Sequence, residues 1–397
     1  MKTYAQHGYG DGQKTSLGLE NDYIDGVIFS PRDISISKLE EKLNDYKKYE
    51  RKDFLFDSQF YVSLLKNHPK LNLSKLAEYF DSYFQFKTKI QLESDNQVNE
   101  TIKRVIDFQE NLPTTGIIAP NILISRSFDS IEGAISRNFI RNAKNNYNGS
   151  KPLYCTLCIS AESLMNLNEL QEFLSIITLL DNPPDGFYIL VSLSQSTLSN
   201  EFFNSDLIAN WMLLNYSLTL NGFEVINGYS DILSPTLVIA GADAVSTGWW
   251  SNLRRFSIEK FTPIQQEGGS LPIIRYYSKA LFKRIRFDEL AALKEKFPEV
   301  LNNLETDNFY LSRDDNSELN RTEEILQSWE TLKKLSNTYD ENISLEDKIQ
   351  KLSEDLDEAH DLFTKINYFY NLNRKSREYH IEPMLNGITK FKKIAEI

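Results

Sequence analysis

The stretch Glu224–Phe256, EVINGYSDILSPTLVIAGADAVSTGWWSNLRRF, contains the local pattern that decides the fold. Its first residues, 224–227, form a short and largely apolar run that predicts a strand. Ser234-Pro235 predicts the start of a short helix, because the missing N–H of proline costs nothing in the first turn. Residues 242–246 are small and apolar and predict a second strand. Two strands joined by one short helix are expected to be parallel neighbours in a sheet.

Short apolar runs of this kind, each followed by a helical pattern, recur along residues 23–300. The predicted strands are residues 26–30, 54–56, 116–124, 153–159, 187–193, 223–227, 242–246 and 271–275. Strand–helix units of this number and length predict a (β/α)8 barrel of the TIM type. A doubly wound open sheet is the alternative, since it shares the same local pattern.

The two ends of the chain depart from this pattern. Residues 1–22 are polar and rich in glycine, and we expect a flexible arm. Within them, Gly8–Thr15 (GYGDGQKT) resembles a phosphate-binding loop, but Gln13 stands where the motif requires glycine and no buried strand is evident before it. Residues 301–397 are acidic and helical in pattern, and we expect a C-terminal appendage that contacts a partner, self-associates or caps the barrel. The DEAH sequence at Asp357–His360 is predicted to be the surface of a helix.

Composition limits the functions that are open to this chain. The net charge of −12 over 397 residues argues against a protein that coats nucleic acid non-specifically, although it leaves room for a local basic pocket. Cys155 and Cys158 lie three residues apart in a predicted strand, on opposite faces, and are predicted to be buried thiols and not half of a zinc site. Two reduced cysteines, no apolar leader and no long apolar run predict a cytoplasmic protein without a membrane span.

The predicted chemistry depends on carboxylates. None of the four histidines lies at a predicted strand end inside the barrel, so we expect no metal site and no cofactor. Asp33 and Asp57 follow the first two predicted strands and are the predicted catalytic residues. Carboxylates on adjacent strands are expected to couple, so that one holds a proton at neutral pH. The alternative is that each aspartate caps the helix that follows it.

A cationic cluster follows the last predicted strands. Arg254 and Arg255 come after the seventh and Arg275 ends the eighth, where barrels often bind phosphate. Trp249 beside them suits stacking on a base or sugar. We therefore predict a basic mouth that binds a phosphate-bearing ligand or nucleic acid, with packing of the barrel rim as the alternative. The other predicted ligand contacts at strand ends are Gln59, Asn121, Arg126, Asn227 and Asp231.

Two short motifs resemble a known superfamily. Asp57-Ser58-Gln59-Phe60 is similar to the second-strand motif DSGGFQ of the tRNA-guanine transglycosylases and their DNA-acting deazaguanine relatives, and Asn227-Gly228-Tyr229 is faintly similar to their late glycine motif. The resemblance implies a barrel that exchanges a base by breaking an N-glycosidic bond, with Asp57 in base recognition or proton transfer. Two features depart from the superfamily. Its nucleophilic aspartate falls near Ser246, and its zinc-binding cysteines are absent.

Three functions follow as hypotheses. The first is an enzyme that acts on a nucleobase or nucleotide. The second is a non-catalytic barrel that serves as a binding module, in which the helical tail recruits a protein partner. The third is a flavin-type oxidoreductase, because Gly241–Gly248 (GADAVSTG) is similar to the late segment of phosphate- and flavin-binding barrels.

Overall fold

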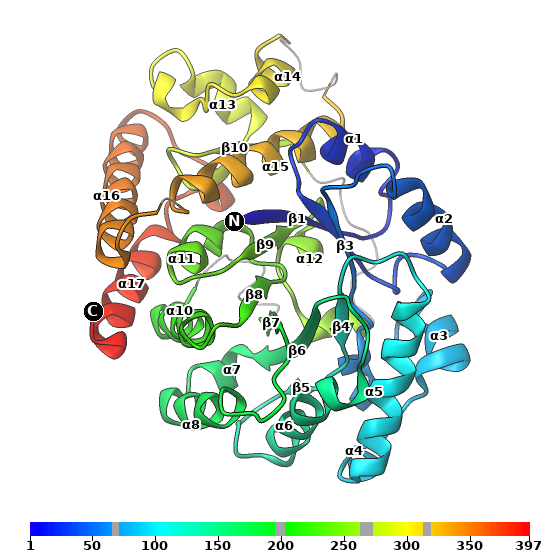
Figure 1. Ribbon diagram of the computed structural model, residues 1–397. Coiled ribbons are helices and arrows are strands. Elements are labelled where there is room, and N and C mark those ends of the chain that lie inside the picture. Colours follow the sequence, from blue (N-terminus) through cyan, green and yellow to red (C-terminus); the bar gives the residue numbers. More distant parts are fainter. Residues whose placement is uncertain (66–70, 195–202, 263–272, 313–318, 341) are drawn as a thin grey trace.

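Parallel strands and surrounding helices form a nearly closed barrel, seen almost along its axis in Figure 1. The structure is a computed structural model that describes residues 1–65, 71–194, 203–262, 273–312, 319–340 and 342–397. The strands follow one another around the barrel in the order β3-β2-β1-β9-β8-β7-β6-β4, and a short β5 (Leu123–Ile124) pairs beside β6. The barrel strands are β1 (Lys2–Gln6), β2 (Gly26–Phe29), β3 (Asp53–Phe56), β4 (Ile117–Ala119), β6 (Leu153–Ser160), β7 (Gly186–Ser192), β8 (Glu224–Asn227) and β9 (Ala244–Thr247).

Hydrogen bonds between the first and last strands of this order bring the two edges of the sheet together. The backbone N–H of Thr115, just before β4, donates to the carbonyl oxygen of Phe54 in β3 at 2.9 Å. The N–H of Phe54 donates to Oγ1 of Thr115 at 2.8 Å. A doubly wound sheet keeps its two edges apart, so this contact favours the barrel, and the predicted fold class is confirmed.

The stretch from Glu224 to Phe256 folds as its sequence predicts. Strands β8 and β9 are parallel neighbours, with Ile226 opposite Ala244. Between them lies α11 (Ser234–Ile239), which has Pro235 in its first turn. Gly241 follows the helix with a φ of +98°, a left-handed conformation that glycine adopts without strain.

The flexible arm predicted at residues 1–22 is wrong, because residues 2–6 are strand β1 in the barrel wall. Tyr4 pairs with Gly26 of β2 on one side and with Ser246 of β9 on the other. The strand lacks an apolar run because its buried positions include the polar side chains of Thr3 and Gln6. Helix α1 (Lys14–Glu20) follows it.

The eighth strand predicted at residues 271–275 is also wrong for the residues of this range that the structure describes. Arg275 begins β10 (Arg275–Ser278), which pairs only with the antiparallel strand β11 (Lys283–Arg286) in a separate two-stranded sheet. Residues 271 and 272 of this prediction lie outside the described residues. The N-terminal strand β1 therefore supplies the eighth strand of the barrel.

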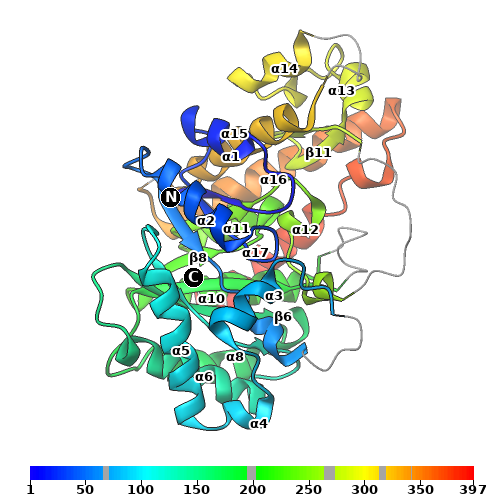
Figure 2. The same cartoon turned by 90° about the vertical axis from the view of Figure 1, so that its right-hand side faces the viewer.

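Helix α15 (Arg321–Thr338) completes the helical layer, so the barrel does not end near residue 300 as predicted. It packs against α1, α11 and β1 (Figure 2). Its Trp329 is buried and donates from Nε1 to the carbonyl oxygen of Thr247 at 3.3 Å. A Cβ on Gly18 of α1 would lie 2.9 Å from the Trp329 ring, so the close approach of α1 requires glycine there. The other helices of the layer include α2 (Ile36–Tyr46), α5 (Asp95–Glu110), α6 (Ile131–Ala143), α8 (Leu167–Ile177) and α10 (Ser205–Leu220).

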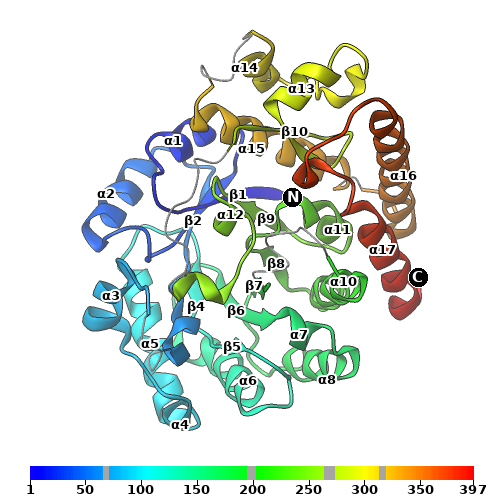
Figure 3. The same cartoon turned by 180° about the vertical axis from the view of Figure 1, so that it is seen from behind.

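The last two helices form the C-terminal tail, α16 (Leu345–Phe369) and α17 (Ile381–Ala395). Helix α17 packs on α10, and α16 packs on α17 and α11 (Figure 3). Helix α10 is therefore covered on its outer side as well as by the barrel, which explains its nearly continuous apolar sequence. In the part of the chain that the structure describes, no helix is long and apolar enough to cross a membrane.

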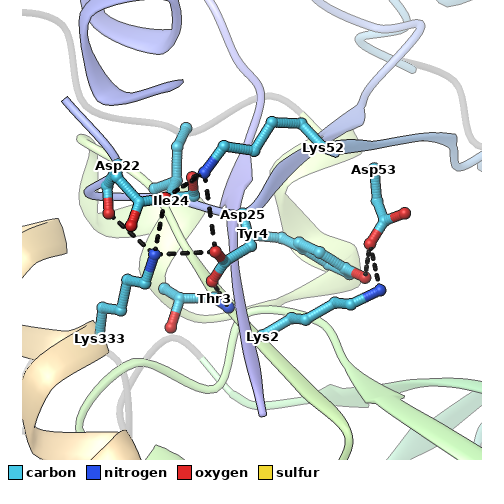
Figure 4. A network of polar contacts seen from close by, with 9 residues as sticks. All are labelled: Lys2, Thr3, Tyr4, Asp22, Ile24, Asp25, Lys52, Asp53 and Lys333. Atoms are coloured by element: carbon cyan, nitrogen blue, oxygen red, sulfur yellow. Dashed lines mark hydrogen bonds and ion pairs between the residues drawn. The ribbon is translucent and has the colours of Figure 1, made fainter. Parts of the chain in front are cut away.

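A polar network at the amino ends of the strands ties α15 to the barrel (Figure 4). Nζ of Lys333 in α15 donates to Oδ1 of Asp25 and to the carbonyl oxygen of Asp22, each at 2.8 Å. Oδ2 of Asp25 also accepts from the backbone N–H of Thr3 at 2.9 Å. Residues at the amino end of a barrel usually serve stability. This network joins β1 and the loop before β2 to α15. The remaining members of the network are Lys2, Tyr4, Ile24, Lys52 and Asp53.

The two cysteines behave as predicted. Cys155 and Cys158 lie in β6 and are buried free thiols. Burial raises the pKa of Cys158 well above its usual value, so the thiol stays protonated and unreactive at neutral pH.

Candidate active site

Asp57 follows β3 directly, at the carboxyl end of the barrel, and its side chain is buried. Its Oδ1 accepts from the backbone N–H of Gln59 at 2.9 Å, and its Oδ2 accepts from Oη of Tyr61 at 3.0 Å. Burial raises the pKa of Asp57 to about 6, although these hydrogen bonds and the charge of Lys260 oppose the rise. A carboxyl group with this pKa can donate or accept a proton at neutral pH.

Lys260 is the cation that faces this carboxyl group. It lies in the 3-10 turn Ile258–Phe261 that comes after β9, and its Nζ donates to Oη of Tyr229 at 3.0 Å. The same Nζ lies 4.6 Å from the centre of the Tyr229 ring and 5.0 Å from that of Phe256. Burial lowers the pKa of Lys260 to about 8, while the negative charges of Asp33 and Asp57 oppose this shift.

Three buried tyrosines surround the pair. Burial raises the pKa of Tyr61, Tyr188 and Tyr229 well above the usual value, and the charge of Asp57 adds to the rise. All three phenols therefore stay protonated near neutral pH and act as hydrogen-bond donors. Tyr188 lies within hydrogen-bonding reach of Asp57 and lowers the pKa of that carboxyl group.

A hydrogen-bond network in the barrel interior, formed by a hydroxyl group and an amide, positions Tyr188 and Tyr229. Oγ of Ser246 in β9 donates to Oε1 of Gln6 in β1 at 3.2 Å. The backbone N–H of Tyr229 donates to the same Ser246 Oγ at 2.9 Å, and Oη of Tyr188 lies 3.5 Å from Oε1 of Gln6. Ser246 is thus engaged in positioning its neighbours through both its donor and its acceptor.

Asp33 follows β2 and lies at the edge of this cluster. Its Oδ1 is 3.4 Å from Nη1 of Arg32, and burial raises its pKa while the charges of Arg32 and Lys260 oppose the rise. The sequence predicts that Asp33 and Asp57 couple directly. In the structure, the charge that influences both carboxyl groups is the ammonium of Lys260.

Three buried polar atoms at neighbouring strand ends have no hydrogen-bond partner among the described residues. They are Nδ1 of His7 after β1, Nε of Arg32 after β2, and Nε2 of Gln59 after β3. Gln59 also has a φ of +53°, a strained conformation for a residue with a side chain. Buried polar groups are usually paired, and unpaired groups grouped around one end of a barrel are typical of a ligand site.

His7 adds a neutral imidazole to this end of the barrel. Burial lowers the pKa of His7 to about 3, and the charge of Lys42 contributes to the shift. The ring therefore presents one donor and one acceptor nitrogen at physiological pH.

Two predicted contact residues, Asn121 and Asn227, bond to partners outside the cluster. Asn121 donates from Nδ2 to the carbonyl oxygen of Thr156 at 2.8 Å, and Asn227 donates from Nδ2 to Oδ1 of Asn215 in α10 at 2.6 Å. Both asparagines are buried and tie strands to helices. Their side chains are therefore engaged elsewhere. Arg126 is exposed and stays a predicted contact.

The predicted phosphate cluster is divided among internal contacts. Oδ1 of Asp231 is 2.8 Å from Nη1 of Arg284 in a buried ion pair. Arg254 is half-buried and donates from Nη2 to the carbonyl oxygen of Trp249 at 3.2 Å. Burial lowers the pKa of Arg254 to about 10, and the charge of Arg284 lowers it further. These contacts do not support a phosphate site here.

The remaining cations and the tryptophan of this cluster also have protein neighbours. Arg275 donates from Nη1 to Oγ of Ser376 at 3.2 Å and to the carbonyl oxygen of Arg284 at 3.1 Å. The guanidinium of Arg255 lies 5.8 Å from the centre of the Phe203 ring. Trp249 is buried and donates from Nε1 to the carbonyl oxygen of Tyr9 at 2.8 Å.

Sequence reasoning missed several members of the cluster for identifiable reasons. His7 follows a strand that the apolar pattern did not reveal, and Tyr229 stands two residues beyond the strand end that was recognised at Asn227. The rule that ligands bind at carboxyl ends of strands is sufficient to find both once the strands are known. Lys260 has no such signal, because it enters from a turn that folds back over the barrel.

The fold and these side chains define a (β/α)8 barrel with a buried carboxyl, lysine and tyrosine cluster at the end where barrel enzymes have their active sites. Neither the models of known protein families nor the curated proteins provide a match to this chain. The function is therefore inferred from the geometry of the site.

Proposed function

We propose that this protein is a barrel enzyme that transfers a proton to or from the nucleobase of its substrate through Asp57. The observation that carries the proposal is the buried Asp57 carboxyl group, whose pKa is about 6 and whose neighbours are Tyr61 and Lys260. A group that titrates near neutrality is suited to general acid–base catalysis. The unpaired Nε2 of Gln59 supplies a donor for the substrate beside it.

The reaction that we favour is cleavage or exchange at an N-glycosidic bond, in which Asp57 protonates the departing base and C1′ of the sugar bonds to water or to an incoming base. This choice rests on the similarity of Asp57-Ser58-Gln59-Phe60 to the transglycosylase motif. A carboxylate nucleophile at Ser246 is not part of the proposal, because that position is a hydroxyl group already bonded to Gln6. Asp57 would therefore act in proton transfer and not as a nucleophile.

The test is an activity assay with mass-spectrometric detection of released bases and of labelled guanine incorporation. The substrates are the common nucleosides, single-stranded and duplex DNA, and tRNA. We expect Asp57→Asn to lower the rate by about 100-fold or more, since loss of a general acid typically has this effect, without lowering the thermal stability.

Asp53→Asn is the matched control, because Asp53 lies on the same strand at the amino end and binds Lys2 and Tyr4. It should keep its activity. Full activity in a folded Asp57→Asn variant would contradict the proposal.

A cavity that Asp57 does not line favours an alternative function, in which the protein is a binding module. The cavity is about 570 Å³ and lies between the β10–β11 hairpin, α15 and α16. Glu299, Asp355, Glu358 and Asp361 contribute carboxylates to its lining. Glu358 belongs to the DEAH sequence, in which Asp357, Glu358 and His360 are exposed on α16 as predicted and Ala359 is buried. Excess negative charge would suit a basic partner, and Glu358→Lys should then weaken binding of an oligolysine peptide while Asp57→Asn has no effect.

A further inference from the structure

We infer that the glycine-rich loop after β1 forms a subsite for the base of a nucleoside, and that this subsite selects against a phosphate group. The inference rests on the proposed function and names the part of the substrate that binds next to the catalytic cluster. The loop, residues 8–12 (GYGDG), is the segment whose sequence resembles a phosphate-binding loop. Its contacts point to a different ligand.

The loop is held in one conformation by side chains from α1 and from the segment after β9. Nε1 of Trp249 and Nε1 of Trp250 both donate to the carbonyl oxygen of Tyr9, at 2.8 and 3.0 Å. Nζ of Lys14 donates to the carbonyl oxygen of Gly10 at 2.6 Å. Gly10 and Gly12 have φ values of +76° and +57°, and a Cβ on either would meet no atom within 4 Å. The backbone is therefore ordered and open to close approach by a ligand.

A carboxylate of the protein already occupies the place that a phosphate would take. Oδ1 of Asp11 accepts from the backbone N–H of Thr15 at 3.0 Å and from Oγ1 of the same residue at 2.9 Å. Nζ of Lys42 in α2 also donates to Asp11. Since α1 has only seven residues and its first-turn donor is used, the loop offers no free helix terminus to an anion.

The cavity beside the loop has a volume of about 420 Å³, within the range of small-molecule sites. Its lining carries four carboxyl groups, from Asp11, Asp33, Glu41 and Asp45, and two amines, from Lys38 and Lys42. One of these amines is bonded to Asp11, and burial lowers the pKa of Lys42 to about 8. The net negative charge disfavours a phosphate and favours the amino groups of a base.

Two further side chains match a planar heterocycle. His7 lines the cavity, is buried, and has an Nδ1 without a hydrogen-bond partner in the described part of the chain. Its neutral ring can exchange hydrogen bonds with ring nitrogens or carbonyl oxygens of a base. Tyr9 also lines the cavity, and its side chain is 77% exposed. Stacking of a base on such a ring is favourable and does not depend on phosphate.

Asp33 connects this cavity with the catalytic cluster. It lines the cavity, and its charge, like that of Asp57, opposes the lowering of the Lys260 pKa by burial. A base in the cavity would therefore lie beside one of the two carboxyl groups that share this lysine. The subsite thus lies on the Asp33 side of the catalytic cluster.

The test is isothermal titration of the full-length protein with adenosine, guanosine, cytidine and uridine, each compared with its 5′-monophosphate. We expect at least one nucleoside to bind, with its monophosphate at least about tenfold weaker because of the surrounding carboxylates. Tyr9→Ala should weaken nucleoside binding about fivefold or more, the lower end of the effect of a stacked base. Glu41→Gln should reduce the discrimination against the monophosphate.

Glu40→Gln is the matched control, since Glu40 is an exposed neighbour on α2 that does not line the cavity. It should leave both affinities unchanged. The inference is overturned if no nucleoside binds, if a monophosphate binds as tightly as its nucleoside, or if Tyr9→Ala and Glu41→Gln behave like Glu40→Gln.

The Asp57→Asn variant separates this inference from the proposed function, because binding requires no turnover. Nucleoside binding by Asp57→Asn and by the parent, together with no reaction in either, would support the subsite and contradict the enzyme. Base release that depends on Asp57 but is insensitive to Tyr9→Ala would support the enzyme and overturn the subsite.

Discussion

Asp57 shows how burial converts an ordinary carboxyl group into one that titrates near neutral pH. It accepts hydrogen bonds from the backbone N–H of Gln59 and from Oη of Tyr61, and the positive charge of Lys260 acts on it. Donors and positive charge stabilise the ionised form, yet desolvation is the larger effect. The folded protein therefore binds a proton at Asp57 more tightly than the unfolded chain does.

This difference predicts a specific dependence of stability on pH. The pKa of Asp57 is about 6 in the folded protein and about 4 in the unfolded chain, so the stabilising effect of its proton is complete below pH 4 and is lost as the pH rises through 6. Relative to Asp57→Asn, the free energy of unfolding of the parent should fall by about 2–3 kcal/mol between pH 4 and pH 7. Urea denaturation at several pH values measures this. A difference between the two proteins that stays constant with pH would contradict the burial argument.

Helix α15 is the element that most changes the interpretation of the sequence. Its Trp329 packs against α1 and bonds to β9, and its Lys333 binds the loop before β2. These contacts make it the last helix of the barrel layer, although the β10–β11 hairpin and several short helices separate it from β9 in the sequence. The acidic character of the region misled the prediction, because Glu324 and Glu330 of α15 are buried with its apolar residues and accept hydrogen bonds from the backbone N–H groups of Arg275 and Thr306.

A pair of substitutions on α15 tests its attachment. Lys333 and Asp25 are both largely buried, with Nζ and Oδ1 2.8 Å apart. Lys333→Ala leaves this carboxylate with fewer donors, and we expect the free energy of unfolding to fall by about 1–2 kcal/mol. Lys334→Ala, at an exposed neighbouring position, should change it by less than about 0.5 kcal/mol. Equal effects in urea denaturation would show that the network in Figure 4 does not hold the helix.

At the scale of the whole molecule, the first strand and helix α15 complete the barrel together. Strand β1 at the start of the chain lies between β2 and β9, and α15 covers it from outside. The β10–β11 hairpin and the residues around it are inserted between β9 and α15. The barrel is therefore complete only when the chain has reached residue 338.

Truncation tests this dependence. A chain that ends at residue 312 lacks α15 and exposes the apolar side of β1, so we expect no cooperative thermal transition. A chain that ends at Asp340 keeps α15 and should retain a cooperative transition. The transition should occur at a lower temperature than in the full chain, because the shorter chain lacks α16 and α17 and leaves α10 uncovered. Circular dichroism during heating measures both. A cooperative transition in the shorter chain would place α15 outside the barrel.

Most of the fold follows from local pattern, because a strand that is buried on both faces has a continuous apolar sequence. Strands β2, β3, β6, β7, β8 and β9 were recognisable for this reason, and Asp33 and Asp57 were identified from their positions just after two of them. The same rule did not reveal the polar strand β1. Its Gln6 is buried because the barrel supplies Ser246 and Tyr188 as partners, and no local sequence records that.

The sequence by itself therefore determined the barrel class, the order of most of its strands and two carboxylates at its carboxyl end. Only the tertiary structure decided which charges face each other. It placed Lys260 beside Asp57 and paired Arg284 with Asp231, through contacts between residues far apart in the chain. Periodicity reports which face of an element is buried, whereas the partner of a buried charge depends on how distant elements pack.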